Sequence, residues 1–463
     1  MSHGSDVATR AMAEHHSRRE VLGEPLIRLV VVSCTFLVIA IGLVGIVIHR
    51  APELSIFDEA THADYAYQIS QGHVPAKGST IAPEILREWS CHGFWDGAPL
   101  PPCAGPPAAA SHYPGLGQDY NFVHPPLYYA ITGVIARVGD AALPGNSHFI
   151  TMARLVGIAW LFAAMLVLYF AVRRLGARWQ MAAAGAILLP LCPQVLYASA
   201  TVTNDAPAAL CGSFAVLMLA RIMVQQKRGW IIPTLVTGLA AATKVLNALP
   251  MMSVAAMLLI VAVVAWREDH RKEAREFALI VLGVLAATVV VYGGWVAFQS
   301  GRGLAGWKSP IEGISGRPIV GSPVAAIFST SFTGFQVIGD FLLPAQLTST
   351  WLTLWVRVLS FLAAAAPLVL LGLTRKREVE RRLAGAALLG MISYPVIVEL
   401  QVYMNSGTYF PQGDGRYGMS IIPLLIACLA MAAQRLGMRR SMLTGIGAGA
   451  AVTLASTAGL LHS

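Results

Sequence analysis

The sequence is poor in charged residues. Of its 463 residues only 12% are Asp, Glu, Lys or Arg, whereas a soluble domain usually carries about 25%. Hydrophobic residues make up 56% of the chain, and long apolar runs recur along it. Many of these runs reach roughly 18 residues, the length needed to cross a bilayer. The composition therefore excludes an ordinary soluble protein and predicts an all-α polytopic membrane protein.

Motifs that bind a soluble nucleotide are also missing. The sequence has no GxxxxGK[ST] phosphate loop and no DxD pattern, and GRGLAGWKS at 301–309 is too loose for a phosphate loop. The energy for any transfer reaction must then come with a lipid-borne donor. The formal net charge of +9 does not indicate nucleic-acid binding, because basic residues of membrane proteins collect in cytoplasmic loops.

The basic clusters predict how the chain crosses the membrane. They lie at Arg18–Arg19, Arg173–Arg174 with Arg178, Lys227–Arg228, Arg267–Arg275, Arg375–Arg382 and Arg435–Arg440. If all of them are cytoplasmic, the N-terminus is cytoplasmic too. About eleven spans result, near 27–49, 149–172, 181–199, 206–225, 231–247, 250–266, 276–299, 351–373, 383–403, 418–434 and 442–461. The stretch 126–138 is short for a span, so it is either a re-entrant or interfacial helix or a tilted twelfth span.

This threading divides the chain into four parts. A cytoplasmic tail (1–26) precedes a transmembrane module (27–299) that includes a long first outer loop (50–122). A second outer loop (300–350) leads to C-terminal transmembrane helices (351–463). Cys91 and Cys103 share the first loop, where a disulfide is reasonable if the loop lies outside the cytoplasm, and chance co-occurrence is the alternative.

The first outer loop begins with IFDEATHADYAYQIS, in which two acids are adjacent. Apolar residues recur there at helical spacing, so 57–71 is predicted as an amphipathic helix at the outer surface with Ser55 as its N-cap. Asp58 and Glu59 would then interact favourably with the helix dipole. Adjacent helical positions point about 100° apart, so one carboxylate can face a membrane cavity, and His62 lies one turn after Asp58. A capping role and a catalytic role are both open.

Polar residues also stand at two later points where the chain enters the membrane from outside. His124 precedes two prolines, and Tyr128 fits an interfacial aromatic belt. A lone histidine is more often structural than functional. Asn204 and Asp205 stand where another apolar run begins. Asp205, two residues before a proline, is either a helix N-cap or part of a substrate cavity.

Two cationic residues are expected to meet a phosphate. Lys244 lies inside an apolar run, where an ammonium group is costly unless it pairs with an acid or binds an anion. Arg416 and Tyr417 follow glycines at the outer mouth of a later span; Arg binds phosphate in a bidentate manner, and glycine amides let the backbone approach it. An interfacial Arg with a Tyr anchor is the alternative. Glu399, in the preceding span, is a predicted partner of Arg416.

Five stretches together resemble the GT-C superfamily of integral-membrane glycosyltransferases, which includes protein O-mannosyltransferases and lipid A aminoarabinose transferases. They are FDEATHADYAYQIS, HPPLYYAITG, ARLVG, TNDAPAAL and QGDGRYGMSIIPLL. The resemblance implies a GT-C-like bundle of about 11–12 transmembrane helices in the plasma (inner) membrane, whose first extracytoplasmic loop carries amphipathic helices. No large soluble C-terminal domain of the kind that some members use to bind the acceptor follows the last span, so acceptor recognition is open.

By the same resemblance, the protein is expected to move a sugar from a polyprenyl-phosphate donor to an extracytoplasmic hydroxyl group of a cell-envelope glycan, lipid or protein. Asp58 matches the family's catalytic carboxylate, the general base of an inverting displacement, and Glu59 matches its neighbouring acid. The donor phosphate would be held by Arg416, Lys244 and Tyr417. The substrate cavity would be lined by His62, His124, Tyr128, Asn204, Asp205 and Glu399.

Three further interpretations stay open. Asp58, His62 and His124 have the ligand types of a divalent metal site, although no closed ligand set is visible. A transporter or flippase of a lipid-linked sugar would use similar charged groups, but it would concentrate them near the membrane midplane. A non-catalytic partner in envelope assembly is the third interpretation.

Overall fold

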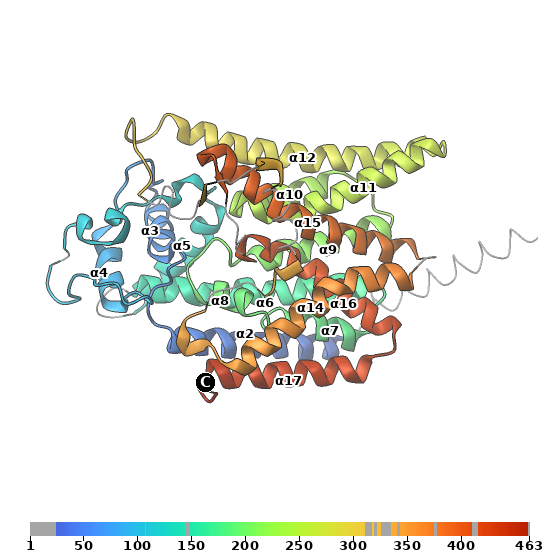
Figure 1. Cartoon of the computed structure of the whole chain (residues 1–463), viewed down its shortest axis with the longest axis horizontal. Coiled ribbons are helices and arrows are strands. Elements are labelled where there is room, and N and C mark those ends of the chain that lie inside the picture. The colour runs from blue at the N-terminus through green and yellow to red at the C-terminus, as the bar shows by residue number, and fades with distance from the viewer. Residues whose placement is uncertain are drawn as a thin grey trace, which may run out of the picture.

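Long apolar helices lie side by side along the long axis of the computed structural model, and shorter helices gather beyond one end of them (Figure 1). The predicted tail (1–26) lies almost wholly outside the described residues, as do parts of the second outer loop (300–350) and residues 410–414 of the late glycine motif. The structure describes residues 25–106, 108–143, 148–310, 317–318, 322–325, 335–339, 343–374, 377–409 and 415–461.

Within these residues, seven helices are long and apolar enough to cross a membrane. Two of them, η4–α11 and η7–α16, begin with a 3-10 turn. The seven are α2 (Leu26–Arg50), α6 (Phe149–Arg174), η4 (Val245–Ala248) with α11 (Leu249–Arg267), α12 (Arg271–Ser300), α14 (Thr350–Leu373), α15 (Glu378–Ser406), and η7 (Gly415–Ile421) with α16 (Ile422–Arg435). The predicted all-α, multi-pass membrane fold is confirmed.

The other four predicted spans are helical but differ from simple crossings. The span 181–199 is two helices, α7 (Trp179–Leu188) and α8 (Pro193–Ala200), bent by 65° at a break that contains Pro190. Pro190 lacks an N–H group and cannot continue the first helix, and a second proline, Pro193, occupies the first turn of the next one. The remaining three are α9 (Ala208–Met223), α10 (Ile231–Thr243) and α17 (Arg439–Thr457).

The stretch 126–138 forms the short helix α5 (Leu127–Ala141), which packs against α3 (Glu59–Ser70). A Cβ atom on Gly133 of α5 would lie 2.0 Å from the carbonyl oxygen of Ala66 of α3, so only glycine permits this approach. Residues Glu59 to Ala66 are all buried. The predicted helix is therefore present, and α5 and neighbouring segments cover its first two turns.

A second helix of the first outer loop, α4 (Pro83–His92), ties this region to the membrane bundle. The buried carboxylate of Glu88 accepts hydrogen bonds from the amides of Phe149 (3.1 Å) and Ile150 (2.8 Å) at the start of α6. A carboxylate at a helix N-terminus satisfies free N–H groups and interacts favourably with the helix dipole. The outer helices are thus fixed to a transmembrane helix by a specific contact.

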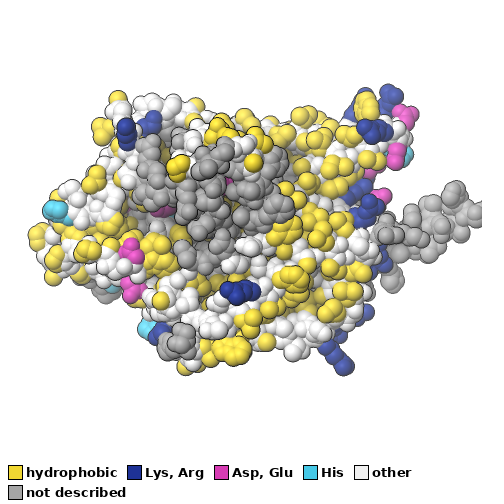
Figure 2. Space-filling model, in the orientation of Figure 1, with side chains coloured by type: hydrophobic (Ala, Val, Ile, Leu, Met, Phe, Trp, Pro, Cys, Tyr) yellow, Lys and Arg dark blue, Asp and Glu magenta, His cyan; other side chains and the backbone are white. Residues whose placement is uncertain are grey.

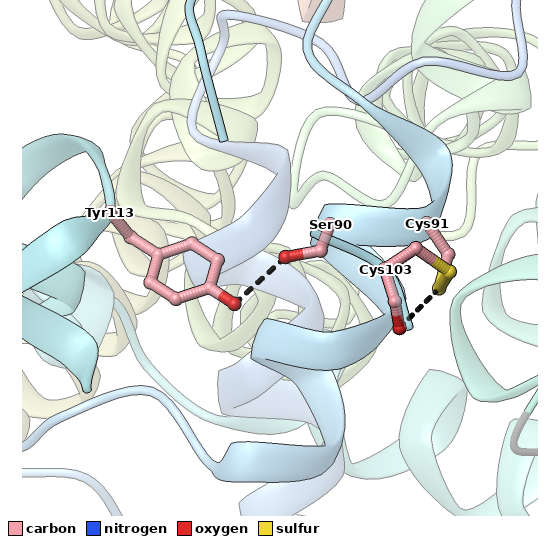
Figure 3. Close-up of a disulfide and its surroundings, with 4 residues drawn as sticks. All are labelled: Ser90, Cys91, Cys103 and Tyr113. Carbon is pink, nitrogen blue, oxygen red and sulfur yellow. Dashed lines mark hydrogen bonds between the residues drawn. A yellow bond between two sulfur atoms is a disulfide. The ribbon is translucent and has the colours of Figure 1, made fainter. Parts of the chain in front are cut away.

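The predicted disulfide between Cys91 and Cys103 is present (Figure 3). It closes a loop directly after α4, and Ser90 beside it shares a 2.8 Å hydrogen bond with the Tyr113 hydroxyl. The remaining short elements of the described chain are η1 (Ala110–His112), η2 (Pro114–Gly117), η3 (Asn121–Val123), η6 (Ala345–Leu347), and the antiparallel pair β1 (Arg317–Pro318) and β2 (Thr408–Tyr409).

Most of the Lys and Arg side chains visible in Figure 2 lie at the end of the bundle away from α3 and α4. The turn between α11 and α12, which carries Arg267 and Arg271, lies at this end. Such an asymmetry is what the positive-inside rule leads one to expect of a membrane protein with one cytoplasmic end.

Candidate active site

Asp58 stands at the point where an extended segment turns into α3. Its backbone has φ +62° and ψ +21°, in the left-handed region that residues other than glycine rarely adopt. Its carbonyl oxygen accepts hydrogen bonds from Thr61 Oγ1 (2.8 Å) and the His62 amide (2.9 Å). Asp58 therefore occupies the N-cap position, and the prediction of Ser55 as the N-cap is wrong. A backbone held in this conformation often marks a functional constraint.

The Asp58 carboxylate has two neighbours of chemical interest. The Tyr120 hydroxyl donates a 2.8 Å hydrogen bond to Oδ1, and Arg416 Nη2 lies 4.0 Å from Oδ2. Burial, followed by the charge of Asp58, raises the pKa of the Tyr120 phenol far above its ordinary value, so the phenol stays protonated and donates. A quarter (25%) of the Asp58 side chain remains exposed. The carboxylate is thus oriented and still accessible.

Glu59, the next residue, has the opposite environment. Its side chain is fully buried and forms a bidentate ion pair with Arg154 of α6, at 2.7 Å (Nε–Oε1) and 2.8 Å (Nη2–Oε2). The same two oxygens accept hydrogen bonds from the amides of Ser55 and Val202, each at 2.8 Å. Four donors on two oxygens satisfy the carboxylate, so Glu59 is held as a structural anion in this arrangement.

Arg154 was not predicted as a site residue, although it belongs to the ARLVG stretch. Besides Glu59, its guanidinium binds the carbonyl oxygens of Ala51 (3.2 Å), Pro52 (3.1 Å) and Glu53 (2.9 Å). It thereby fixes both the segment before Asp58 and the first residue of α3. An arginine inside an apolar span is rare unless it has partners, and that signal alone was enough to single it out.

The cations predicted to hold a phosphate lie around one aromatic ring. The Arg416 guanidinium is 5.0 Å from the centre of the Tyr417 ring, and Lys244 Nζ is 5.3 Å from it. Arg416 Nη2 also donates a 3.1 Å hydrogen bond to the Tyr417 hydroxyl. Lys244 is 2.5 Å from the Asp205 carboxylate, and both are buried. The structure thus brings Asp58, Arg416, Tyr417, Lys244 and Asp205 into one continuous row.

Lys244 reaches this row because α10 stops before it. Its backbone is extended, with φ −165° and ψ 135°, and η4 follows directly. Asn204, next to Asp205, accepts a 3.3 Å hydrogen bond from Asn247 of η4 through its carbonyl oxygen. The side-chain amide of Asn204 is buried and has no hydrogen-bond partner among the described residues. Tyr128 supports the same turn, since its hydroxyl accepts from the Thr203 amide (3.0 Å).

The two predicted histidines are neighbours, with His62 and His124 rings stacked at 6.2 Å between centres. His62 Nδ1 is hydrogen-bonded to the Tyr129 hydroxyl at 2.8 Å. Burial, then the charge of Lys244, lowers the pKa of His124 to about 3, and burial lowers that of His62 well below its usual value. Both rings are therefore neutral. Among the described side chains, no three His, Cys, Asp or Glu residues form a metal-ligand group, so the set of Asp58, His62 and His124 is not assembled as one.

Glu399 is fully buried in α15, as expected for a membrane-embedded acid. Its pairing with Arg416 stays a prediction.

Comparison with known proteins adds two findings. Residues 123–295 match the sequence model of the family described as dolichyl-phosphate-mannose-protein mannosyltransferase. This region contains His124, Arg154 and Lys244, and it excludes Asp58 and Arg416. No curated protein matches the chain.

Among solved structures, the chain is similar to ArnT from Cupriavidus metallidurans bound to undecaprenyl phosphate. The identity is 15%, the match covers 89% of this chain and 78% of that one, and the TM-score is 0.32. A TM-score this low carries no structural argument.

Proposed function

We propose that the chain is a GT-C-type membrane glycosyltransferase, since residues 123–295 match the dolichyl-phosphate-mannose-protein mannosyltransferase family. It would transfer a sugar from a polyprenyl-phosphate donor to a hydroxyl group of a cell-envelope glycan, lipid or protein. The observation that carries the proposal is the position of Asp58. Its carboxylate is partly exposed, receives a hydrogen bond from Tyr120, and lies 4.0 Å from a guanidinium of the cation row. A carboxylate suited to act as a base thus lies beside a cation suited to bind a phosphate.

In the proposed reaction the acceptor hydroxyl attacks the anomeric carbon of the sugar while Asp58 takes its proton. The bond from the acceptor oxygen to the anomeric carbon forms as the bond from that carbon to the phosphate oxygen breaks. The electron pair leaves with the polyprenyl phosphate, and the configuration at the anomeric carbon inverts. One carboxylate suffices for this displacement, which fits the engagement of Glu59 with Arg154.

Arg416 and Lys244 would stabilise the charge that develops on the leaving phosphate, since fixed cations in a site shielded from water act strongly on it. Tyr417 lies between them and holds Arg416 by its hydroxyl. The donor would enter sideways from the bilayer, and the acceptor from the aqueous side. We further propose that the protein lies in the plasma membrane with its N-terminus and basic end in the cytoplasm and the Asp58 site outside.

Purified protein in detergent or nanodiscs tests the proposal. A panel of synthetic polyprenyl-phosphate sugars, beginning with mannose, is incubated with envelope extract, and the release of polyprenyl phosphate is measured. Asp58→Asn is expected to lower the rate by about a hundredfold or more, the usual worth of a general base. Asp96→Asn is the matched control, because Asp96 is an exposed acid of the same outer loop.

A wild-type rate in Asp58→Asn would overturn the assignment of the base. If no donor of the panel is consumed while the protein moves labelled lipid between leaflets in both forms, the flippase interpretation replaces the transferase.

A further inference from the structure

Two carboxylates outside the row described above are buried side by side. Asp64 lies on α3, Asp119 lies just before η3, and neither side chain is exposed to solvent. Asp64 accepts hydrogen bonds from the Ala82 amide at Oδ1 (2.8 Å) and from Gln68 Nε2 at Oδ2 (2.5 Å). No described Lys or Arg forms an ion pair with either acid. Buried carboxylates without a cation are costly, so this pair needs an explanation.

Within the described part of the chain, Asp119 lacks a hydrogen-bond donor at one of its two carboxylate oxygens. Its Oδ1 accepts a 2.8 Å hydrogen bond from the Asn121 amide, whereas its buried Oδ2 has no donor among the described residues. Burial and the charge of Asp64 raise the pKa of Asp119 well above its usual range, and burial raises the pKa of Asp64 to about 7. Two carboxylates at one buried site cannot both be ionised, and a proton between them supplies the missing donor.

The surroundings of the pair do not offset its charge. Phenols and one further acid lie near the pair. The nearby cation, Arg302, follows the end of α12 and interacts with the neighbouring Tyr65. The groups that interact with it or with its neighbours are Glu84 of α4, Tyr65 of α3, Tyr129 of α5, Tyr120 of the loop and Arg302. The shared proton is therefore the main means of keeping the pair together.

The segment that carries Asp119 also carries the hydrogen-bond donor to Asp58. Tyr120 directly follows Asp119, and its hydroxyl binds the Asp58 carboxylate at 2.8 Å. Asn121 Nδ2 donates to Thr61 Oγ1 (2.6 Å), which donates in turn to the Asp58 carbonyl oxygen (2.8 Å). A displacement of Asp119 from α3 would thus change both contacts that orient Asp58.

We propose that Asp64 and Asp119 share one proton and that this proton locks the 119–121 segment onto α3, so that the pair positions Tyr120 on the base Asp58. They are positioning residues, and loss of the proton releases Tyr120. This inference rests on the proposed function only in its catalytic part; the sharing of a proton is independent of it.

The catalytic part is tested by the pH profile of kcat/KM. In the wild type the rate is expected to fall above neutral pH, about tenfold for each pH unit once the proton is lost, as for a single essential proton. Asp119→Asn keeps a donor toward Asp64, in its amide, but carries no titrating group. It should therefore keep the rate at neutral pH and lose the alkaline fall. An alkaline fall that is unchanged in Asp119→Asn overturns the positioning role.

Proton sharing is tested by the melting temperature as a function of pH, which needs no substrate. Since the fold raises the pKa of Asp64 from 3.8 to about 7, it binds the proton more tightly than the unfolded chain. The contribution of the pair to stability is then full below pH 3.8 and declines as the pH rises toward 7. Asp119→Asn should flatten this decline, and Asp64→Asn is the second variant should the first not fold.

The two results separate the possible failures. In one outcome, Asp119→Asn flattens the pH dependence of the melting temperature while the wild type shows no transferase activity. That result would overturn the proposed function and leave proton sharing intact. Equal pH dependence of melting in the wild type and both variants would overturn proton sharing. Asp96→Asn, an exposed acid outside the pair, should reproduce the wild type in both measurements.

Discussion

Glu59 and Arg154 form a bidentate ion pair in which each side chain is at most 1% exposed, with Nε–Oε1 at 2.7 Å and Nη2–Oε2 at 2.8 Å. The neighbouring Asp58 instead presents its carboxylate to Tyr120 and Arg416. Two adjacent acids thus have separate tasks, because the left-handed backbone of Asp58 directs their side chains into different surroundings. One acid fixes the start of α3, and the carboxylate of the other stays partly exposed.

Breaking the Glu59–Arg154 pair is expected to destabilise the fold. Glu59→Gln leaves the guanidinium without its counterion, and breaking a buried pair costs about 3–5 kcal/mol. The melting temperature should fall strongly, while the transfer rate per folded molecule stays within a few-fold of the wild type. A variant with wild-type stability and no transfer would instead make Glu59 a catalytic acid. Asp96→Asn, at an exposed position of the same outer loop, is the control.

Tyr120→Phe is expected to slow transfer without unfolding the protein. The substitution removes only the hydroxyl that donates to Asp58 Oδ1, and a hydrogen bond to a charged group contributes about 1.5–3 kcal/mol. A loss of about tenfold or more in kcat should follow. Tyr113→Phe, which removes a hydroxyl bound to Ser90 beside the disulfide, should leave kcat unchanged. Equal rates in the two variants would contradict the role of Tyr120.

The sequence was sufficient to predict features that depend on local pattern. Apolar runs marked the eleven predicted spans, all of which are helical, and the proline pair at 125–126 marked where α5 begins. The breaks themselves were harder to predict. Nothing around Lys244 indicates an extended residue between two helical segments, and the close approach at Gly133 depends on which helix lies opposite.

Sequence patterns singled out residues that lie close together in the structure, but they did not predict the contacts between them. Glu59 and Arg154 are 95 residues apart in sequence, and Asp58 and Tyr120 are 62 apart. Pairing at such distances depends on tertiary packing, which single-residue patterns do not encode. Tyr120 offered no signal beyond being an aromatic residue in a loop, whereas Arg154 was detectable as a charge within an apolar run.

The disulfide is expected to stabilise the first outer loop. Cys91 and Cys103 are 12 residues apart, and a loop of that size gains about 3 kcal/mol from closure. The double variant Cys91→Ser/Cys103→Ser should melt at a lower temperature and transfer more slowly. The closed loop carries Trp95, which packs on Phe57 beneath Arg416. Treatment of the wild type with a reductant should reproduce the variant; no change in either case would contradict the prediction.

The neutral histidines predict instability in acid. The fold lowers the pKa of His124 from 6.5 to about 3. Between these pH values the unfolded chain binds a proton at this residue and the folded chain does not. The contribution of the neutral His124 to stability is therefore full above pH 6.5 and is lost as the pH falls toward 3. His124→Gln should lessen the fall in melting temperature over this range. His73→Gln, at an exposed position, should not, and equal slopes in both variants would contradict the burial of a neutral ring.

Lys244 and Asp205 allow stability and donor binding to be separated. Each single variant, Lys244→Met or Asp205→Leu, leaves one buried charge without its partner and should cost about 3–5 kcal/mol, whereas the double variant removes both charges and should regain most of that loss. If Lys244 also holds the donor phosphate, the stable double variant still binds polyprenyl phosphate weakly and shows a raised KM for the donor. Recovery of both melting temperature and KM in the double variant would make the pair purely structural. If the double variant recovers its melting temperature but keeps a raised KM, Lys244 also binds the donor phosphate.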